Sequence, residues 1–176
     1  MVAGPSVLRI GVVDPVGSID PRTMAEATTI LLARQIFETP FLASSAGDAI
    51  PALFQEKLVE EPGSGGLKFS TTVRQDARFS DGTVVTPEDV VGALAQDPVF
   101  TSRASASFRN GRVHLTLFAP NTRFDLFLTM CGMLYRESGG ALLGTGAYMM
   151  GPSDKEVVRL VRNPHARTPW KIESIE

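Results

Sequence analysis

Few of the side chains that commonly carry chemistry lie close together in this sequence. It has one cysteine and two histidines, too few for a zinc site built from those ligands alone. Met130, Cys131 and Met133 offer the sulfur ligands that suit Cu(I). They lie in an apolar run, however, where methionine and cysteine are ordinary core residues. The pattern therefore predicts a core segment and no metal site.

Acid–base catalysis needs at least two titratable side chains close enough to act on the same substrate. His114 alternates with apolar neighbours, so it is expected on the outer face of a strand, and His165 follows an Asn-Pro pair in a turn. Asp81 is explained as a turn aspartate and Asp89 as an acid in the first turn of a helix. None of these residues has an identifiable catalytic partner.

Catalytic motifs are absent from the sequence. It contains no GxSxG elbow, Walker A loop, HExxH helix or CxxC pair. Were the chain an enzyme acting in a cleft, Glu137, Cys131 and His165 would be the first residues to replace. We expect instead a protein that is not an enzyme, with no catalytic residue and no cofactor.

A glycine-rich loop, Gly144, Thr145 and Gly146, precedes Tyr148. It lacks the third glycine at dinucleotide spacing, which excludes a Rossmann-type site. Two interpretations stay open. The main chain of the loop and the ring of Tyr148 are candidate contacts for an extended ligand. Alternatively, the glycines permit a close backbone approach and Tyr148 belongs to the core.

A second candidate loop, Val16, Gly17 and Ser18, lies between two predicted elements. The apolar run over Leu8–Val13 predicts a buried strand. Asp20 before Pro21 predicts the start of a helix that extends to about Phe37. Loops that rigid elements position in this way commonly contact ligands. We therefore add Val16, Gly17 and Ser18 to the candidate ligand-binding residues.

The remaining pattern alternates short strands with helices, which predicts an α+β (mixed α/β) fold. A turn over residues 62–66 suggests a hairpin, and Thr86-Pro87-Glu88-Asp89 predicts a capped helix start. The other expected elements are a strand over Arg112–Phe118 after a tight turn at Asn110-Gly111, a helix over Phe124–Leu134, and a strand over Val157–Val161. Lys171–Glu176 is expected to be a last short strand or a frayed tail.

Composition restricts the class of protein. The 176 residues have a formal net charge of −2, 43% hydrophobic residues and 20% charged residues, values that exclude overall disorder and disfavour a nucleic-acid binder. Five arginines gather in residues 101–136. We interpret them as a solvated face that pairs with the acidic part of the chain, with an anion site as the sharper alternative. No signal peptide or membrane-spanning run is evident, which implies the cytoplasm if Met1 is the native start.

One segment resembles a known family. Residues 72–91 are similar to the signature of the family 5 extracellular solute-binding proteins, the oligopeptide-, dipeptide- and nickel-binding components of ABC importers. The matching residues are Val73-Arg74, Phe79-Ser80-Asp81-Gly82, Thr86 and Asp89-Val90. Further similar pieces follow in the family's order: Leu8 to Val13, Ile19-Asp20-Pro21, Phe37 to Phe41, Pro51-Ala52-Leu53, Val113 to Pro120, Gly144 to Tyr148, and Arg162-Asn163-Pro164.

The resemblance implies the first lobe of a periplasmic-binding-protein type II-like fold: a mixed sheet with flanking helices and a small inserted subdomain. Residues 1–43 and 141–176 would form the core sheet, and residues 44–140 the subdomain. Full members of the family close a second lobe over the ligand, so a single lobe of 1–176 is expected to bind weakly or only with that second lobe.

The implied function is recognition of a peptide or small solute for an ABC transporter, in the periplasm or outside the cell. Expected partners are the solute, an ABC permease, a second-lobe chain or a homodimer mate, with no nucleic acid. The alternative is a repurposed lobe that serves as a scaffold, acting as a homodimer or as half of a split binding protein.

Overall fold

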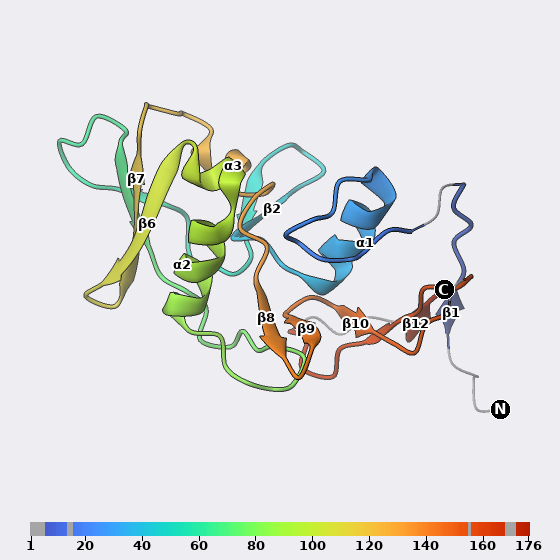
Figure 1. Cartoon of the computed structure of the whole chain (residues 1–176). Helices are drawn as coiled ribbons and strands as arrows, with labels where there is room; N and C mark the ends of the chain where they lie inside the picture. The colour runs from blue at the N-terminus through green and yellow to red at the C-terminus, as the bar shows by residue number, and fades with distance from the viewer. Residues whose placement is uncertain (1–5, 14–15, 155, 168–171) are drawn as a thin grey trace. The chain divides into compact units, whose positions relative to one another are not determined.

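The computed structural model describes residues 6–13, 16–154, 156–167 and 172–176 (Figure 1). These residues form two compact units. The first unit contains residues 1–37, 78–83 and 135–176, and the second contains residues 38–77 and 84–134. The sequence-based division into a core sheet and a subdomain over residues 44–140 stays a prediction. The mixture of several small sheets and a few helices confirms the predicted α+β class.

The first unit is built on a four-stranded mixed sheet of order β1-β12-β11-β10. Strand β1 runs parallel to β12, whereas the other neighbours are antiparallel. Helix α1 and the hairpin of β8 and β9 complete the unit. Its elements are β1 (Val7–Leu8), α1 (Ala27–Ile36), β8 (Tyr135–Ser138), β9 (Ala141–Gly144), β10 (Tyr148–Met150), β11 (Leu160–Arg162) and β12 (Ser174–Ile175).

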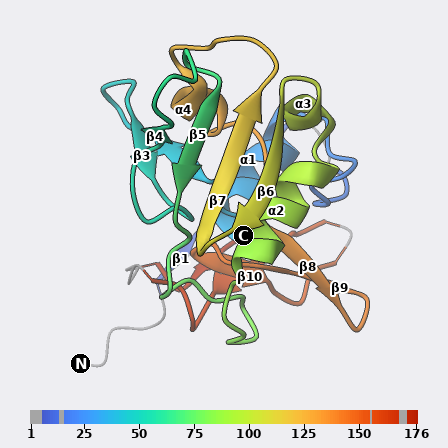
Figure 2. The same ribbon diagram turned by 90° about the vertical axis from the view of Figure 1, so that its left-hand side faces the viewer.

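The second unit is built on an antiparallel sheet of order β4-β5-β7-β6 (Figure 2). The buried side chains of β7 lie on one face of this sheet, and α2 packs beside β6. Its elements are β2 (Phe41–Ala43), β3 (Ala49–Pro51), β4 (Val59–Glu60), β5 (Lys68–Thr71), α2 (Pro87–Gln96), α3 (Pro98–Thr101), β6 (Ala104–Arg109), β7 (Arg112–Leu117) and α4 (Phe124–Phe127).

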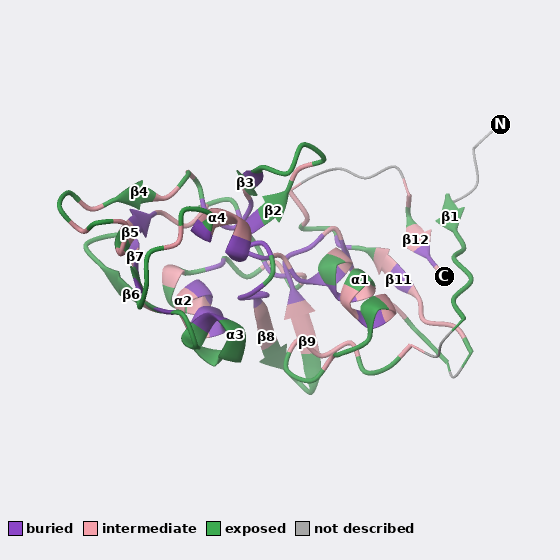
Figure 3. Ribbon diagram, turned by 90° about the horizontal axis from the view of Figure 1, so that it is seen from above, coloured by how far each residue is buried: buried purple, intermediate pink, exposed green. Residues whose placement is uncertain are grey.

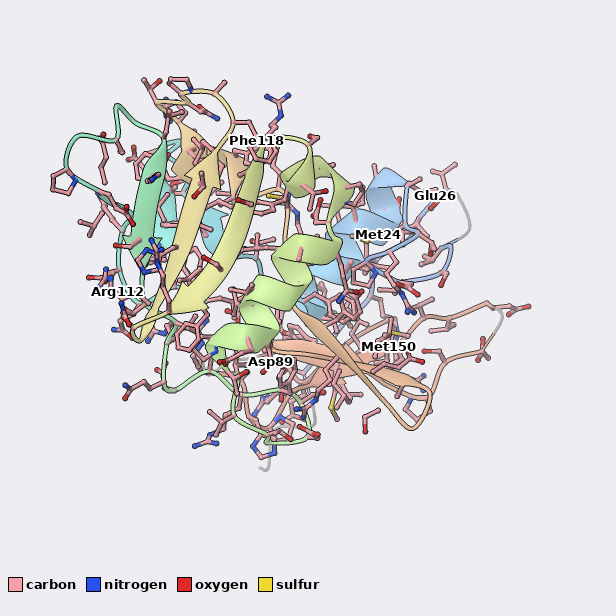
Figure 4. All side chains as sticks on the ribbon, turned by 60° about the vertical axis from the view of Figure 1, so that its left-hand side comes forward. Met24, Glu26, Asp89, Arg112, Phe118 and Met150 are labelled. Atoms are coloured by element: carbon pink, nitrogen blue, oxygen red, sulfur yellow. The ribbon has the colours of Figure 1, made fainter. Side chains whose placement is uncertain are left out.

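Three predictions about the second unit are confirmed. The hairpin of β4 and β5 forms, and the turn at Asn110-Gly111 joins β6 to β7 with φ of 52° and 75°, as a type I′ turn requires. Helix α2 begins as expected. The Thr86 hydroxyl accepts from the Asp89 N–H, and the Asp89 carboxylate accepts from the Thr86 N–H. Figure 4 places Asp89 at this end of α2.

Three predicted elements are shorter than expected. The strand expected over Leu8–Val13 is limited to β1. Helix α1 begins at Ala27 and not near Pro21, because Asp20 forms a separate turn: its carbonyl accepts from the Thr23 N–H, and its carboxylate binds Arg22. The helix expected over Phe124–Leu134 is limited to α4, because the following N–H groups bond three residues back and Gly132 adopts a φ of 68°.

The two strands predicted near the end of the chain are also shorter than expected. The strand expected over Val157–Val161 begins later, as β11. The last strand is limited to β12, and Lys171 lies outside the described residues. The arginine segment pairs with acids, as expected, in Arg112–Glu56, Arg109–Glu61 and Arg136–Asp81. Figure 4 shows Arg112 at the start of β7.

Candidate functional site

The loop of Val16, Gly17 and Ser18 lies next to the first turn of α1. Val16 is half-buried, and Gly17 and Ser18 are exposed. A Cβ added at Gly17 would lie 3.1 Å from the Glu26 carboxylate and 3.6 Å from the Thr29 hydroxyl. Glu26 is the residue before α1, and it makes no side-chain cap (Figure 4). This part of the predicted site is therefore open to solvent beside an uncapped helix start.

The glycine loop packs against the other end of α1. A Cβ added at Gly144 would overlap the Ile36 carbonyl, and one added at Gly146 would overlap the Gln35 carbonyl. The Gly146 N–H donates to the Ile36 oxygen at 2.8 Å. Only glycine allows the backbone to approach a helix end this closely. The close-packing interpretation thus accounts for both glycines.

The main-chain groups of this loop already have partners inside the first unit. The Gly144 carbonyl accepts from the Ser80 N–H at 2.9 Å, and the Gly146 carbonyl accepts from the Asn163 side chain at 2.8 Å. Asn163 is itself buried. A ligand would have to compete with these bonds, so the geometry gives the loop a structural role, and its ligand-binding role stays a prediction.

Tyr148 and Thr145 are buried within the first unit. The Tyr148 hydroxyl donates to the Ile172 carbonyl at 3.1 Å, and burial raises the pKa of this phenol. The Thr145 hydroxyl is buried and has no hydrogen-bond partner among the described residues. A buried hydroxyl without a partner costs free energy, so Thr145 marks a place where the packing of the loop is not optimised for stability.

The structure does not bring the two predicted loops together. Gly17 lies near Glu26 and Thr29, whereas Gly144 and Gly146 lie near Gln35 and Ile36. Seven residues of helix separate Thr29 from Ile36, which corresponds to about 10 Å at 1.5 Å per residue. Gly17 therefore lies near the start of α1, and Gly144 and Gly146 lie near its end. Of the two loops, residues 16–18 are the more accessible.

A charged cluster around Arg22 lies in the same unit and was not predicted. The Arg22 guanidinium donates to both oxygens of Asp20, lies 3.4 Å from Glu137, and stacks over the Tyr135 ring at 5.6 Å. The Arg22 bond holds the pKa of Asp20 below its usual range. The sequence signal was the Asp-Pro-Arg triplet, which we interpreted as a helix start.

The turn at residues 80–83 supplies a second polar group of the first unit. The Asp81 carboxylate accepts from the Thr83 N–H at 2.9 Å and from Arg136 at 3.2 Å, which lowers the pKa of Asp81. The ring of His165 lies 3.0 Å from where a Gly82 Cβ would stand. The predicted turn role of Asp81 is confirmed, and His165 packs on that turn.

The three residues considered for catalysis occupy unreactive surroundings. Cys131 is 1% exposed, and burial raises the pKa of its thiol to about 12, so it is not a thiolate at neutral pH. Glu137 is paired with Arg22, and the ring of His165 packs on the turn at Gly82. The other histidine, His114, lies on the outer face of β7 and bonds Glu61 at 2.8 Å, and this bond lowers the pKa of Glu61. The structure holds Cys131 in the core, as predicted.

No metal cluster and no membrane helix are found in the part of the chain that the structure describes. Within it, no three His, Cys, Asp or Glu side chains gather as a metal site would require. Among the same residues, no helix has the length and apolar character needed to cross a bilayer.

An open hollow of about 450 Å³ lies in the second unit. Phe69 and Phe124 line it, and their rings stack 6.2 Å apart. The loop before β4, the turn after it and the segment before α4 also line it, and Lys57, Glu60 and Asp125 are its charged residues. A second open hollow of about 520 Å³ lies beside exposed Phe118. Sequence reasoning identified neither hollow, because their residues come from separate segments.

The chain shares its fold with solute-binding proteins of known structure. The pheromone receptor PrgZ matches at a TM-score of 0.81 with 18% identity, over 99% of this chain and 42% of PrgZ. The oligopeptide-binding protein AppA from Bacillus subtilis, in complex with a nonapeptide, matches at 0.83 with 11% identity, over 97% and 39%. NikA from Brucella suis, in complex with Fe(III)-EDTA, matches at 0.79 with 17% identity, over 96% and 38%.

These matches confirm, at the level of the fold, the predicted resemblance to family 5 solute-binding proteins. The chain spans about 40% of the length of the structures it matches. No protein-family model and no curated protein sequence matches it.

Proposed function

We propose that this chain is a ligand-binding lobe of a solute-binding protein that serves an ABC transporter. The fold is the observation that supports this proposal most. Nearly all of this chain matches part of proteins whose structures contain a bound peptide or metal chelate. None of these proteins is described as an enzyme, which supports a binding role. The solute is a peptide or another small molecule.

Residues 16–18 are the part of the first unit that we assign to the solute. Gly17 and Ser18 are accessible and Val16 is half-buried, and Gly17 packs closely against Glu26 and Thr29. The Gly144 loop packs against the other end of α1, and its contact with the solute stays a prediction. An open lobe buries less of a ligand than a closed cleft, in which about 70–90% of the ligand surface is buried. Binding by this chain alone is therefore weak and strengthens with a second lobe.

Nuclear magnetic resonance titration tests this proposal, since it detects weak binding. A library of short peptides is added to the labelled chain, and the amide signals of Gly17 and Ser18 are expected to shift in a saturable way. Gly17→Leu should abolish these shifts, while Gly92→Leu, at an open position of α2, should leave them unchanged. Absence of saturable shifts with peptides and with metal–histidine complexes would contradict the proposal.

The location and the transport partner follow from the same assignment. A binding component of an importer meets its solute outside the cytoplasm, in the periplasm or at the cell surface, and delivers it to a permease. Fractionation of cells that produce the protein from its native gene tests this location. Recovery only from the cytoplasm would contradict it.

A second candidate function is a scaffold that binds another polypeptide. The exposed apolar residues at the start of the chain favour it: Val7, Leu8, Ile10, Val12 and Val13 are all exposed. Contiguous apolar surface on a soluble protein commonly marks an interaction site.

A further inference from the structure

The open hollow beside Phe118 lies where β6 begins and β7 has ended, and we term it the Arg103 hollow. Ala104 and Leu117 are the last paired residues of these strands, and beyond them the Phe118 N–H donates to the Arg103 carbonyl at 2.9 Å. Pro120 has no N–H, so the ladder does not continue past this bond. The backbone on both sides of the hollow is therefore held in place. The residues that line it are Ser102, Arg103, Leu117, Phe118, Ala119, Pro120, Asn121 and Phe124.

Much of the lining of the Arg103 hollow is apolar. Phe118 follows directly after β7 and is 63% exposed (Figure 4). Ala119 and Pro120 continue the apolar lining. An exposed phenylalanine beside a hollow presents a large ring surface on which an apolar group of a ligand packs. The hollow therefore suits a ligand with an apolar body.

Arg103 is the one charged residue among the described residues that line this hollow. Its guanidinium lies over the ring of Phe127, 5.7 Å from the centroid, which favours one position of the cation. Phe124 and Phe127 are the buried residues of α4 (Figure 3). In the part of the chain that the structure describes, the guanidinium makes no hydrogen bond and no ion pair. Its N–H groups are therefore available to an anion.

Asn121 supplies a second donor to the same hollow. Its side-chain carbonyl accepts from the Arg123 N–H at 3.0 Å, and its NH2 group has no acceptor among the described residues. A carboxylate has two oxygens and accepts from a guanidinium and an amide together. The neighbouring hollow, by contrast, is lined by Glu60 and Asp125 as well as a lysine, so its charges do not select an anion.

We propose that the Arg103 hollow binds a carboxylate attached to an apolar group, with Arg103 and Asn121 on the carboxylate and Phe118 on the apolar group. The single positive charge of the lining matches the single negative charge of such a ligand. The last residue of a peptide with an apolar side chain and a free aromatic acid share this chemistry. The site belongs to the second unit, differs from residues 16–18, and does not rest on the proposed solute-binding role.

Nuclear magnetic resonance titration of the intact chain tests the charge requirement. N-acetylphenylalanine should shift the amide signals of Phe118 and Asn121 in a saturable way, and its neutral amide, N-acetylphenylalaninamide, should bind about tenfold more weakly or worse. Arg103→Gln should weaken binding of the acid by a similar factor. Arg109→Gln removes the same charge from β6, where the arginine pairs with Glu61, and should leave the affinity unchanged. Equal binding of acid and amide, or equal losses in the two variants, would overturn the inference.

A second pair of variants tests the apolar contact. Phe118→Ala should weaken binding of N-acetylphenylalanine several-fold, whereas Met130→Ala should not. These residues are matched in exposure, at 63% and 64%, and Met130 does not line the hollow. Circular dichroism checks that every variant folds. Unchanged affinity of the Phe118→Ala variant would overturn the assignment of the apolar group.

Two further ligands distinguish the sources of the carboxylate. Tighter binding of N-acetyl-alanyl-phenylalanine than of 3-phenylpropionate would identify a peptide C-terminus, and the reverse order or equal binding would identify a free acid; each result supports the site. Absence of saturable shifts at Phe118 and Asn121 with both ligands would overturn it. The signals of Gly17 and Ser18 in the same spectra report separately on the proposed solute site.

Discussion

Helices α1 and α2 have the same length, ten residues, but different interactions stabilise them. Helix α2 is specified by its own sequence: Thr86, Pro87 and Asp89 supply a complete capping box and a proline at the first position. Helix α1 has no side-chain cap. Its buried positions are Thr29, Ala33 and Ile36, and its last turn is contacted by the glycine loop. One helix is locally encoded, and the other depends on distant residues that pack against it.

The largest effect expected from this difference concerns the glycine loop. Gly146→Ala should destabilise the first unit by about 3 kcal/mol, because the new methyl group overlaps the Gln35 carbonyl and backbone atoms move little. Urea denaturation followed by circular dichroism measures the loss. The matched control is Gly92→Ala, inside α2 with open space around it, which should stabilise the protein by about 0.5–1 kcal/mol. Equal effects of the two substitutions would contradict the comparison.

Removal of the α2 cap should have a smaller effect. Thr86→Ala takes away the acceptor of the Asp89 N–H and should cost about 1 kcal/mol of unfolding free energy. Thr86→Ser keeps the hydroxyl and should restore most of that loss. If Thr86→Ala were neutral in urea denaturation, α2 would depend on tertiary packing as α1 does.

The turn at Asp20 should give a pH-dependent effect. The pKa of Asp20 is lowered in the folded state by Arg22, so the ionised carboxylate contributes stability above its unfolded pKa of about 3.9. This contribution is lost as the pH falls through the lowered folded value. Asp20→Asn should therefore be less stable than the unmodified chain at pH 7, and the two should converge at strongly acid pH. Denaturation curves at several pH values measure this. An unchanged difference at all pH values would exclude the ion pair as its source.

The smallest effect is expected at the start of α1. Glu26→Ser would supply the missing side-chain cap and should stabilise the helix by about 0.5 kcal/mol or somewhat more. Thermal denaturation of this variant beside Glu26→Ala distinguishes the new cap from the loss of the carboxylate. If serine gave no gain over alanine, the backbone at residue 26 would be unsuited to capping.

The sequence predicted two candidate loops, and their contact with a ligand stays a prediction. In the structure Gly17 and Ser18 are accessible, whereas Gly144, Thr145 and Gly146 are buried. Glycine at 144 and 146 was compatible with either a ligand contact or a close packing, because both need a residue without a side chain. The choice depends on which atoms lie opposite, and no local pattern contains that information. The Arg22 cluster was missed because Asp20-Pro21 is also a common helix start.

By itself, the sequence determined the elements whose signals are local: the capped start of α2, the turn at Asn110-Gly111, and the alternation of β7. In these, each residue interacts with neighbours a few positions away, so composition and spacing suffice. Only the tertiary structure decided how the apolar run at residues 7–13 pairs and that the glycine loop closes on a helix end. Those outcomes depend on contacts between residues more than a hundred positions apart, such as Ile36 with Gly146 and Ile10 with Glu176, which no segment specifies alone.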